Sequence, residues 1–521
     1  MDTLRAEREK TDQNEMQIET GDQAIKDKTV MKKGMPATTI VIFGASGDLT
    51  WRKLIPALYN NFKKGRLAEC ATILGFARRP LTDETFRARL REGVATFSPE
   101  TFDPAIWEEF ARQVHYCQAD LDKAEDFPKL DSYLTKIEGG PSNRLYYLAT
   151  APEHYPIIVS ELGMAGMASN PACWRRIVIE KPFGRDLYSA LALNQAVHSV
   201  FNESQVYRID HYLGKETAQN ILFFRFANTI FEPVWNRRYI NNVQVTVAED
   251  VDVGDRAGYY DSAGVVRDMF QNHLLQLLAL VAIEPPSSFN AEAVRNEKAK
   301  LLESIRPIAL TDTVRGQYAG YAKAKGVAAG SQTATYAAMK LYIDNWRWQG
   351  VPFYLRSGKA LMRKGSEIII EFQRPPHLMF HLPEGSGITP NILSMCIQPD
   401  EGMHLRFEAK EPDSEQGMRS VDMDFHYRSS FHGTLPEAYE RLLLDALAGD
   451  ASLFTRSDSI EAAWRLLDPI VESWEAQASS PMLVYPVGSW GPEEADQLLE
   501  RDGRSWRLGC VDEPGIIHAG Q

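Results

Sequence analysis

The sequence has few cysteines, and their spacing is not that of a metal site or a disulfide framework. The five are odd in number, scattered, and free of any C-x-x-C pair. A zinc site needs clustered ligands, and a small disulfide scaffold needs an even set at short spacings. We therefore expect reduced thiols in a cytosol-like compartment, and no zinc, at Cys70, Cys117, Cys173, Cys396 and Cys510.

Long apolar runs and an excess of positive charge are missing too. No apolar run approaches the ~18 residues of a membrane span, so we do not expect a membrane protein. The 57 Lys and Arg against 70 Asp and Glu give a net charge of −13, which argues against general binding to nucleic acid or anionic lipid. Any phosphate on a ligand must therefore be held by a local basic cluster.

The length of 521 residues predicts two to four domains, and no internal repeat is present. Residues 1–36 are polar, mixed in charge and poor in aromatics, so we expect a disordered tail. They contain neither a secretory signal nor a transit peptide pattern.

The first ordered pattern is a strand, a glycine turn and a helix. TTIVIFG, starting at Thr38, has the composition of a buried parallel strand, and GASGDL leads from it into an amphipathic helix. Gly44 would allow the tight turn, and Gly47 would let the backbone approach a pyrophosphate at the helix amino terminus. An ordinary tight turn is the alternative, because G-x-x-G is a weak signal by itself.

A second strand, residues 71–77, ends at Arg78. In a dinucleotide-binding fold this strand end faces the adenine ribose, where an acidic residue would favour NAD. Arginine favours the 2′-phosphate of NADP, with Ser46 as a further donor. Two surface arginines before a turn are the alternative.

Further strand candidates follow at βαβ spacing and predict a doubly wound, Rossmann-like domain over residues 37–209. Ligands of such sheets bind beyond the carboxyl ends of the strands, which places Lys181 where cofactor and substrate would meet. The bond before Pro182 could be cis and set the direction of that lysine. The further strands are residues 114–119, 144–149, 176–179 and 205–209, with helices at 156–164 and 187–201 between them.

The segment RIDHYLGKE, residues 208–216, concentrates cations and donors. If it were helical, Arg208, His211 and Lys215 would share one face beside Tyr212. Such a face repels itself unless an anion covers it, and phosphate suits these donors. A solvated polar helix start is the alternative.

Beyond this segment the pattern changes to an α+β domain over residues 210–521 with a large, mainly antiparallel sheet. Met403, Leu405 and Phe407 alternate with polar residues, as in a sheet with one wet face. Strands are expected at 242–249, 367–372, 403–409 and 421–427, and helices at 261–283, 436–448 and 457–475.

His273 stands in the mostly apolar helix RDMFQNHLLQLLAL, with Asp268 slightly over one turn earlier. By itself such a histidine is more often a hydrogen-bonded core residue than a catalyst.

Several long motifs, in order, make the chain resemble the glucose-6-phosphate dehydrogenases from about Thr38 almost to its end. They are GASGDLTWRKLIPALYN, EKPFGRDL, RIDHYLGKE, RDMFQNHLLQLL and VPFYLRSGKAL. The resemblance implies oxidation of D-glucose 6-phosphate to 6-phospho-D-glucono-1,5-lactone with NADP, the entry step of the pentose phosphate pathway. It implies that His273 is the general base and that Asp210 orients it.

The resemblance also assigns the binding residues. His211, Tyr212 and Lys215 would hold the 6-phosphate. The sugar would be bound by Lys181, Glu249, Asp268 and Lys359. NADP would be touched by Gly44, Ala45, Ser46, Gly47, Asp48, Leu49, Arg78, Tyr155 and Lys181, and hydride transfer needs no metal.

The resemblance implies a homodimer or homotetramer joined through the large sheet, in the cytoplasm. Some members hold a second, structural NADP on that sheet, but Cys396 and His404 replace an arginine and a tyrosine there, which argues against the site here. Two other classes stay open: an oxidoreductase of an unphosphorylated sugar, and a non-catalytic NADP-binding assembly or regulatory protein.

Overall fold

The computed structural model describes residues 37–67, 71–377, 379, 388–414, 417–431, 435–476 and 481–510. The predicted tail, residues 1–36, lies outside these ranges, as does Cys70. The described chain forms two compact units, of which the first holds the residues up to Ala149 with Ser169–Arg175 and Leu443–Gly449. The predicted domain boundary at 209/210 stays a prediction. No helix in the described ranges is long and apolar enough to cross a bilayer.

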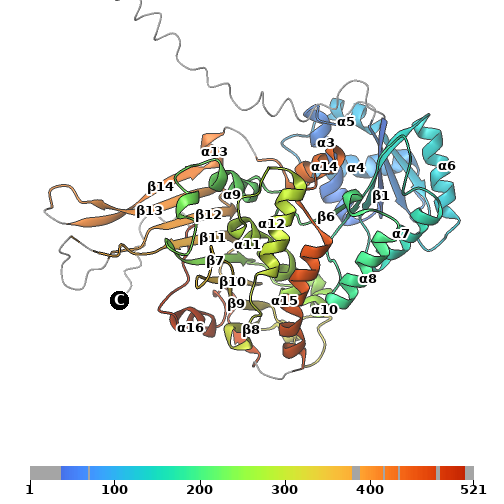
Figure 1. Ribbon diagram of the computed structural model, residues 1–521. Coiled ribbons are helices and arrows are strands. Elements are labelled where there is room, and N and C mark those ends of the chain that lie inside the picture. The colour runs from blue at the N-terminus through green and yellow to red at the C-terminus, as the bar shows by residue number, and fades with distance from the viewer. Residues whose placement is uncertain are drawn as a thin grey trace, which may run out of the picture. The chain divides into compact units, whose positions relative to one another are not determined.

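The first unit contains four parallel strands in the order β4-β1-β2-β3. Its central strand β1 (Ala37–Phe43) is buried over almost its whole length, as its apolar sequence predicts. Strands and helices alternate, which is the Rossmann-like pattern expected for this part of the chain (Figure 1). The other elements are α3 (Ile55–Lys63), β2 (Ala71–Ala77), α4 (Asp83–Phe97), α5 (Pro104–Ala111), β3 (Val114–Gln118), α6 (Asp126–Glu138) and β4 (Ser142–Leu148).

The second unit contains a nine-stranded sheet in the order β14-β13-β12-β11-β7-β10-β9-β8-β16. Only the pairs β7·β10 and β8·β16 are parallel, so the expected mainly antiparallel sheet is confirmed. Its strands are β7 (Ile240–Ala248), β8 (Thr313–Tyr318), β9 (Tyr336–Tyr342), β10 (Pro352–Gly358), β11 (Gly365–Phe372), β12 (Ile392–Gln398), β13 (Gly402–Lys410), β14 (Met418–His426) and β16 (Leu483–Tyr485).

The remaining strands are short. β6 (Val206–Ile209) pairs in parallel with β5 (Arg175–Ile179) and antiparallel with β15 (Phe454–Thr455). The remaining helices are α7 (Tyr155–Met164), α8 (Leu187–His198), α9 (Glu216–Phe226), α10 (Ala257–Val265), α11 (Leu275–Ala282), α12 (Ala291–Glu303), α13 (Tyr427–Ser430), α14 (Ala438–Ala448), α15 (Ser457–Glu475) and α16 (Glu494–Glu500).

The single long helix predicted at 261–283 is interrupted. Gly264 has φ 69° and ψ 168° and kinks the chain near the end of α10. A wide π-helical segment, Val266–Leu274, follows and runs into the fully buried α11. The π-helical segment packs on β7 and β10, while α12 packs on α11 and α15 (Figure 1). The segment that carries His273 is therefore enclosed between the sheet and an outer layer of helices.

Residues 504–510 lie on the large sheet as a C-terminal strap. The Gly509 and Cys510 backbone N–H groups both donate to Glu367 Oε2 at 3.1 Å, and Arg507 Nε donates to Glu371 at 3.1 Å. A disulfide joins Cys510 to Cys396 on β12.

The expectation of reduced cysteines without a disulfide is therefore wrong for this pair. Cys117 and Cys173 are free thiols. The two bonded residues are 114 positions apart, with Cα atoms 5.6 Å apart. Spacing in the sequence does not reveal such a pair, because only the folded sheet brings the strap to β12.

Reduction is expected to lower thermal stability. A disulfide that closes so long a loop restricts the unfolded chain and typically contributes about 2–4 kcal/mol. Dithiothreitol should therefore lower the Tm of the native protein by several degrees, measured by calorimetry. The Cys510→Ser variant should melt at the lower temperature with or without reductant. Equal Tm values for oxidised and reduced native protein would contradict this role.

Candidate active site

The turn after β6 carries several of the predicted site residues of the second unit. Residues 206–209 are strand and residues 210–215 a turn, with Lys215 capping the start of α9. The predicted helical face is therefore wrong. Arg208 is buried and donates hydrogen bonds to Glu203 (2.7 Å) and Asn194 (3.0 Å), so it does not join the proposed phosphate donors. A strand ending at Ile209 releases the next residues into a turn, where their side chains converge.

Asp210 and His273 form a buried hydrogen-bonded pair. His273 Nδ1 donates to Asp210 Oδ1 at 2.5 Å, and both side chains are 1% exposed. The Tyr212 backbone N–H donates to the same oxygen at 3.0 Å. On the other side of the ring, Lys181 Nζ donates to His273 Nε2 at 3.0 Å. With Nδ1 as donor, the lone pair of Nε2 is the basic site of the ring.

The surroundings favour a neutral imidazole beside a carboxylate. Burial lowers the pKa of His273, and the attraction of Asp210 only partly offsets this, while the Lys181 cation adds to the lowering. Burial alone would raise the pKa of Asp210, but its electrostatic interaction and hydrogen bond with the His273 ring outweigh burial and hold that pKa below its usual value. Burial also lowers the pKa of His211 well below the ordinary value. At neutral pH the pair is thus poised to accept a proton at Nε2.

Beyond Lys181, the charged groups of Asp268, Glu249 and Lys359 extend the site away from His273. Lys181 Nζ also bonds Asp268 Oδ1 at 3.2 Å, and Lys359 Nζ lies 2.5 Å from Glu249 and 3.9 Å from Asp268. Glu249 and Lys359 directly follow β7 and β10, which run parallel with Ala248 opposite Gly358. Parallel strand ends bring the two side chains together, although 110 residues separate them.

His211, Tyr212 and Lys215 lie around the same pair. The Tyr212 ring is 4.4 Å from that of His273, and the His211 ring is 4.6 Å from it, centroid to centroid. Lys215 Nζ lies 5.0 Å above the Tyr212 ring. All seven residues predicted to bind substrate thus lie around the Asp210–His273 pair in the second unit, and their individual roles stay predictions.

Sequence reasoning missed two polar residues of this cluster. Gln398 donates to Tyr212 Oη (3.1 Å) and to Ser366 Oγ (2.9 Å), and it accepts from Lys215. Gln398 is the last residue of β12 and Ser366 the second of β11. Their position at strand ends was a possible signal, but neither side chain carries a charge that would have drawn attention.

Asp210, His211 and His273 also offer three potential metal ligands within 4.8 Å of one another, the only such group in the described ranges. The prediction that the reaction needs no metal stays a prediction.

The predicted nucleotide turn, in the first unit, has a backbone that only glycine permits. Gly44 has φ 81°, and a Cβ on Gly47 would lie 3.0 Å from the Gly44 carbonyl oxygen. A Cβ on Gly75 of β2 would lie 2.8 Å from the Ala45 Cβ, so this glycine lets the turn approach the sheet. Because the glycines carry no side chain, a pyrophosphate could approach the backbone at the start of the helix. The residues present therefore fit a dinucleotide.

The other predicted cofactor residues differ in exposure. Ser46, Asp48 and Leu49 continue the turn into the helix at its surface. Arg78 is exposed directly after β2, where a 2′-phosphate could be paired. Tyr155, in the second unit, is fully buried, and its hydroxyl has no hydrogen-bond partner among the described residues.

On the large sheet, Cys396, His404 and the nearby Arg356 are all engaged in protein contacts. Arg356 lies between Trp490 and Trp506, 4.9 and 4.2 Å from their ring centroids. Cys396 is in the disulfide, and His404 Nδ1 lies 2.7 Å from Asp424. The absence of that site stays a prediction.

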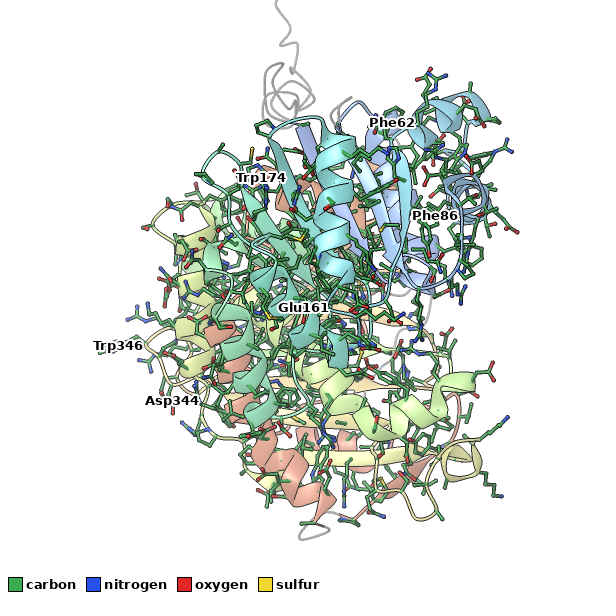
Figure 2. The ribbon with its side chains drawn as sticks, turned by 90° about the vertical axis from the view of Figure 1, so that its right-hand side faces the viewer. Phe62, Phe86, Glu161, Trp174, Asp344 and Trp346 are labelled. Atoms are coloured by element: carbon green, nitrogen blue, oxygen red, sulfur yellow. A yellow bond between two sulfur atoms is a disulfide. The ribbon has the colours of Figure 1, made fainter. Side chains whose placement is uncertain are left out.

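A hollow of about 920 Å³ elsewhere in the second unit is not a competing candidate. Its charged groups are already paired, Arg225 with Glu232 and Arg347 with Glu284. Its rim includes Trp346, 93% exposed and labelled in Figure 2. The hollow offers no base comparable to His273.

Comparison with known proteins bears on both halves of the chain. Residues 41–220 match the family "Glucose-6-phosphate dehydrogenase, NAD binding domain", and residues 222–507 match "Glucose-6-phosphate dehydrogenase, C-terminal domain". The glucose-6-phosphate 1-dehydrogenase of Chlamydia pneumoniae is 44% identical over 91% of this chain and 96% of its own. That of Aggregatibacter actinomycetemcomitans is 45% identical over 90% and 97%.

Two solved structures agree with these matches. One is a glucose-6-phosphate dehydrogenase in complex with its substrate glucose 6-phosphate, with a TM-score of 0.86 and 35% identity over 91% of this chain and 99% of that one. The Mycobacterium avium glucose-6-phosphate 1-dehydrogenase has a TM-score of 0.79 and 36% identity over 91% and 100%. The chain belongs to the glucose-6-phosphate dehydrogenase family.

Proposed function

We propose that the protein oxidises D-glucose 6-phosphate to 6-phospho-D-glucono-1,5-lactone, with NADP as hydride acceptor, at the first step of the oxidative pentose phosphate pathway. The observation that carries the proposal is the buried Asp210–His273 pair in a chain of this family. A carboxylate that fixes an imidazole leaves Nε2 free to act as a base.

The proposed chemistry at C1 is removal of a proton and a hydride. His273 Nε2 takes the hydroxyl proton, and Asp210 stabilises the resulting imidazolium. NADP, when bound, accepts the hydride from C1. Lys181, which donates to Nε2 here, would instead donate to the C1 oxygen and hold it toward the base. Glu249, Asp268 and Lys359 would hold the other sugar hydroxyls.

The phosphate would bind to His211, Tyr212 and Lys215. Gln398 already joins Lys215 to Tyr212, so the two donors are held in place before substrate arrives. An enzyme of unphosphorylated sugars would not need this cationic group. A non-catalytic nucleotide-binding protein would not need the buried His273–Asp210 pair.

The nucleotide would be held by Gly44, Ala45, Ser46, Gly47, Asp48, Leu49, Arg78, Tyr155 and Lys181. The backbone of the glycine turn suits the pyrophosphate, and Arg78 suits the 2′-phosphate.

A homo-oligomer, dimer or tetramer, is proposed through the β13–β14 hairpin. One face of the hairpin pairs Met403 with Phe425 and Leu405 with Met423, and Met423 is 61% exposed. A half-exposed apolar sheet face is suited to a second copy. A cytoplasmic location is proposed because charged glucose 6-phosphate and NADP do not cross membranes unaided.

Replacement of the base should affect turnover and spare binding. His273→Asn is expected to lower kcat by at least ~10²-fold with KM nearly unchanged, because a general base acts mainly in the transition state. Formation of NADPH, followed by absorbance, measures this. The same change at the surface residue His198 serves as control. Undiminished activity would remove His273 from the role.

Loss of the cation proposed to bind the phosphate should raise KM for glucose 6-phosphate. Lys215→Ala is expected to raise KM for glucose 6-phosphate by roughly 10- to 100-fold, the effect of losing a charged hydrogen bond. The kcat/KM for unphosphorylated glucose should stay nearly constant, since it has no phosphate to lose. Preserved affinity for glucose 6-phosphate would contradict the assignment, and Lys300→Ala, an exposed site, is the matched control.

The cofactor preference should depend on Arg78. Arg78→Ala is expected to lower the ratio of kcat/KM for NADP to that for NAD by about 10-fold or more, because only NADP carries the 2′-phosphate. Steady-state kinetics with both cofactors measure the ratio. Arg79→Ala, one residue further along, should change it less. An unchanged ratio in Arg78→Ala would mean that another group binds the 2′-phosphate.

A further inference from the structure

The bend that follows β2 is held by one side chain of the neighbouring strand β3. Tyr116, which is 6% exposed, places its Oη 2.6 Å from the Arg79 carbonyl oxygen and 3.0 Å from the Ala77 carbonyl oxygen. Its single proton serves both acceptors as a three-centre hydrogen bond. These carbonyls belong to the residues on either side of Arg78. The backbone that carries Arg78 is therefore held in place from β3.

The same tyrosine holds the other end of the connection between β2 and α4. Its backbone N–H donates to Asp83 Oδ1 at 2.7 Å, and Asp83 is the first residue of α4. Within the connection, the ring of Pro80 fixes its own φ and restricts Arg79 to extended conformations. Residues 78–82 are thus anchored at both ends by Tyr116 and stiffened in between.

Packing fixes the position of the Tyr116 ring independently of these hydrogen bonds. Its centroid lies 4.8 Å from that of Phe86 on α4, which is 1% exposed and labelled in Figure 2. A Cβ on Gly75 of β2 would lie 2.6 Å from Phe86 Cζ, so this glycine makes room for the Phe86 ring. Burial raises the pKa of Tyr116, so the hydroxyl stays protonated and remains a donor at neutral pH. Replacing Tyr116 with phenylalanine would keep the ring contact and remove only the hydroxyl.

We infer that Tyr116 is a positioning residue for cofactor selectivity, because it holds the backbone of residues 77–79 so that Arg78 is presented to the 2′-phosphate of NADP. The inference rests on the proposed role of Arg78. An exposed arginine on a loose bend would lose backbone freedom on binding the phosphate, and that loss would weaken binding. A bend that is fixed beforehand avoids the loss. NAD carries no 2′-phosphate, so its binding should depend far less on Tyr116.

The first test is the ratio of kcat/KM for NADP to kcat/KM for NAD in Tyr116→Phe. The ratio should fall by about 3- to 10-fold, mainly through KM for NADP, with kcat within about 2-fold of native. Tyr59→Phe is the matched control, because Tyr59 is a fully buried tyrosine of the same unit whose hydroxyl is also bonded to backbone, that of Asp103. The control should leave the ratio unchanged. An equal loss with both cofactors in Tyr116→Phe would mark a purely structural tyrosine and overturn the inference.

A double variant tests whether Tyr116 acts through Arg78. In protein that already carries Arg78→Ala, the further change Tyr116→Phe should leave the ratio where it is, because no arginine remains to be positioned. A second fall as large as the first would show that Tyr116 affects the cofactor by another route, and the inference would then be wrong.

A binding measurement separates this inference from the proposed function. Isothermal titration with 2′,5′-ADP and with 5′-AMP gives the contribution of the 2′-phosphate without sugar or turnover. Binding of 2′,5′-ADP that is weaker by about 3- to 10-fold in Tyr116→Phe, with unchanged binding of 5′-AMP, supports the inference. It does so even in a protein that does not oxidise glucose 6-phosphate, where only the proposed function is overturned. Unchanged binding of 2′,5′-ADP in Tyr116→Phe overturns the inference and leaves the proposed function standing.

Discussion

The hydrogen bond between Asp210 and His273 is the interaction on which the rest of the site depends. It joins the turn after β6 to the π-helical segment, two places 63 residues apart in the chain. Because both groups are buried, the bond fixes the ring orientation and leaves a single basic nitrogen. The neighbouring Tyr212 and Lys181 are arranged with respect to that ring. Without the bond the same side chains would form a polar cluster with no defined acceptor for a proton.

Charge balance is the second constraint on this site. Lys181 and Lys359 are matched by Asp268 and Glu249, so a neutral sugar ring would meet paired charges whose hydrogen bonds can be exchanged for its hydroxyls. Lys215 also donates to a neutral amide, that of Gln398. The part of the site around Lys181 and Lys359 is thus electrically balanced, in a protein whose net charge is −13.

The large sheet supplies the fixed positions for these groups. The carboxyl ends of β7 and β10 carry Glu249 and Lys359, and the adjoining ends of β11 and β12 carry Ser366 and Gln398. The C-terminal strap and its disulfide contact the same two strands, β11 and β12, through Glu367 and Cys396. On β11 and β12, the residues that contact the strap are therefore neighbours of residues in the candidate site.

The sequence by itself determined the elements whose signal is local. The apolar run of β1, the Gly44–Gly47 turn and the alternation along β13 are properties of neighbouring residues, and the long motifs identified the family. Tertiary structure alone decided what depends on distant residues. It turned residues 210–215 into a turn, because β6 ends in a buried pairing and not in a helix. It broke the helix before His273 at Gly264, joined Cys396 to Cys510, and placed Gln398 against Lys215. The disulfide and the Gln398–Lys215 contact join segments that no local pattern couples, and only the packing of the sheet brings them within bonding distance.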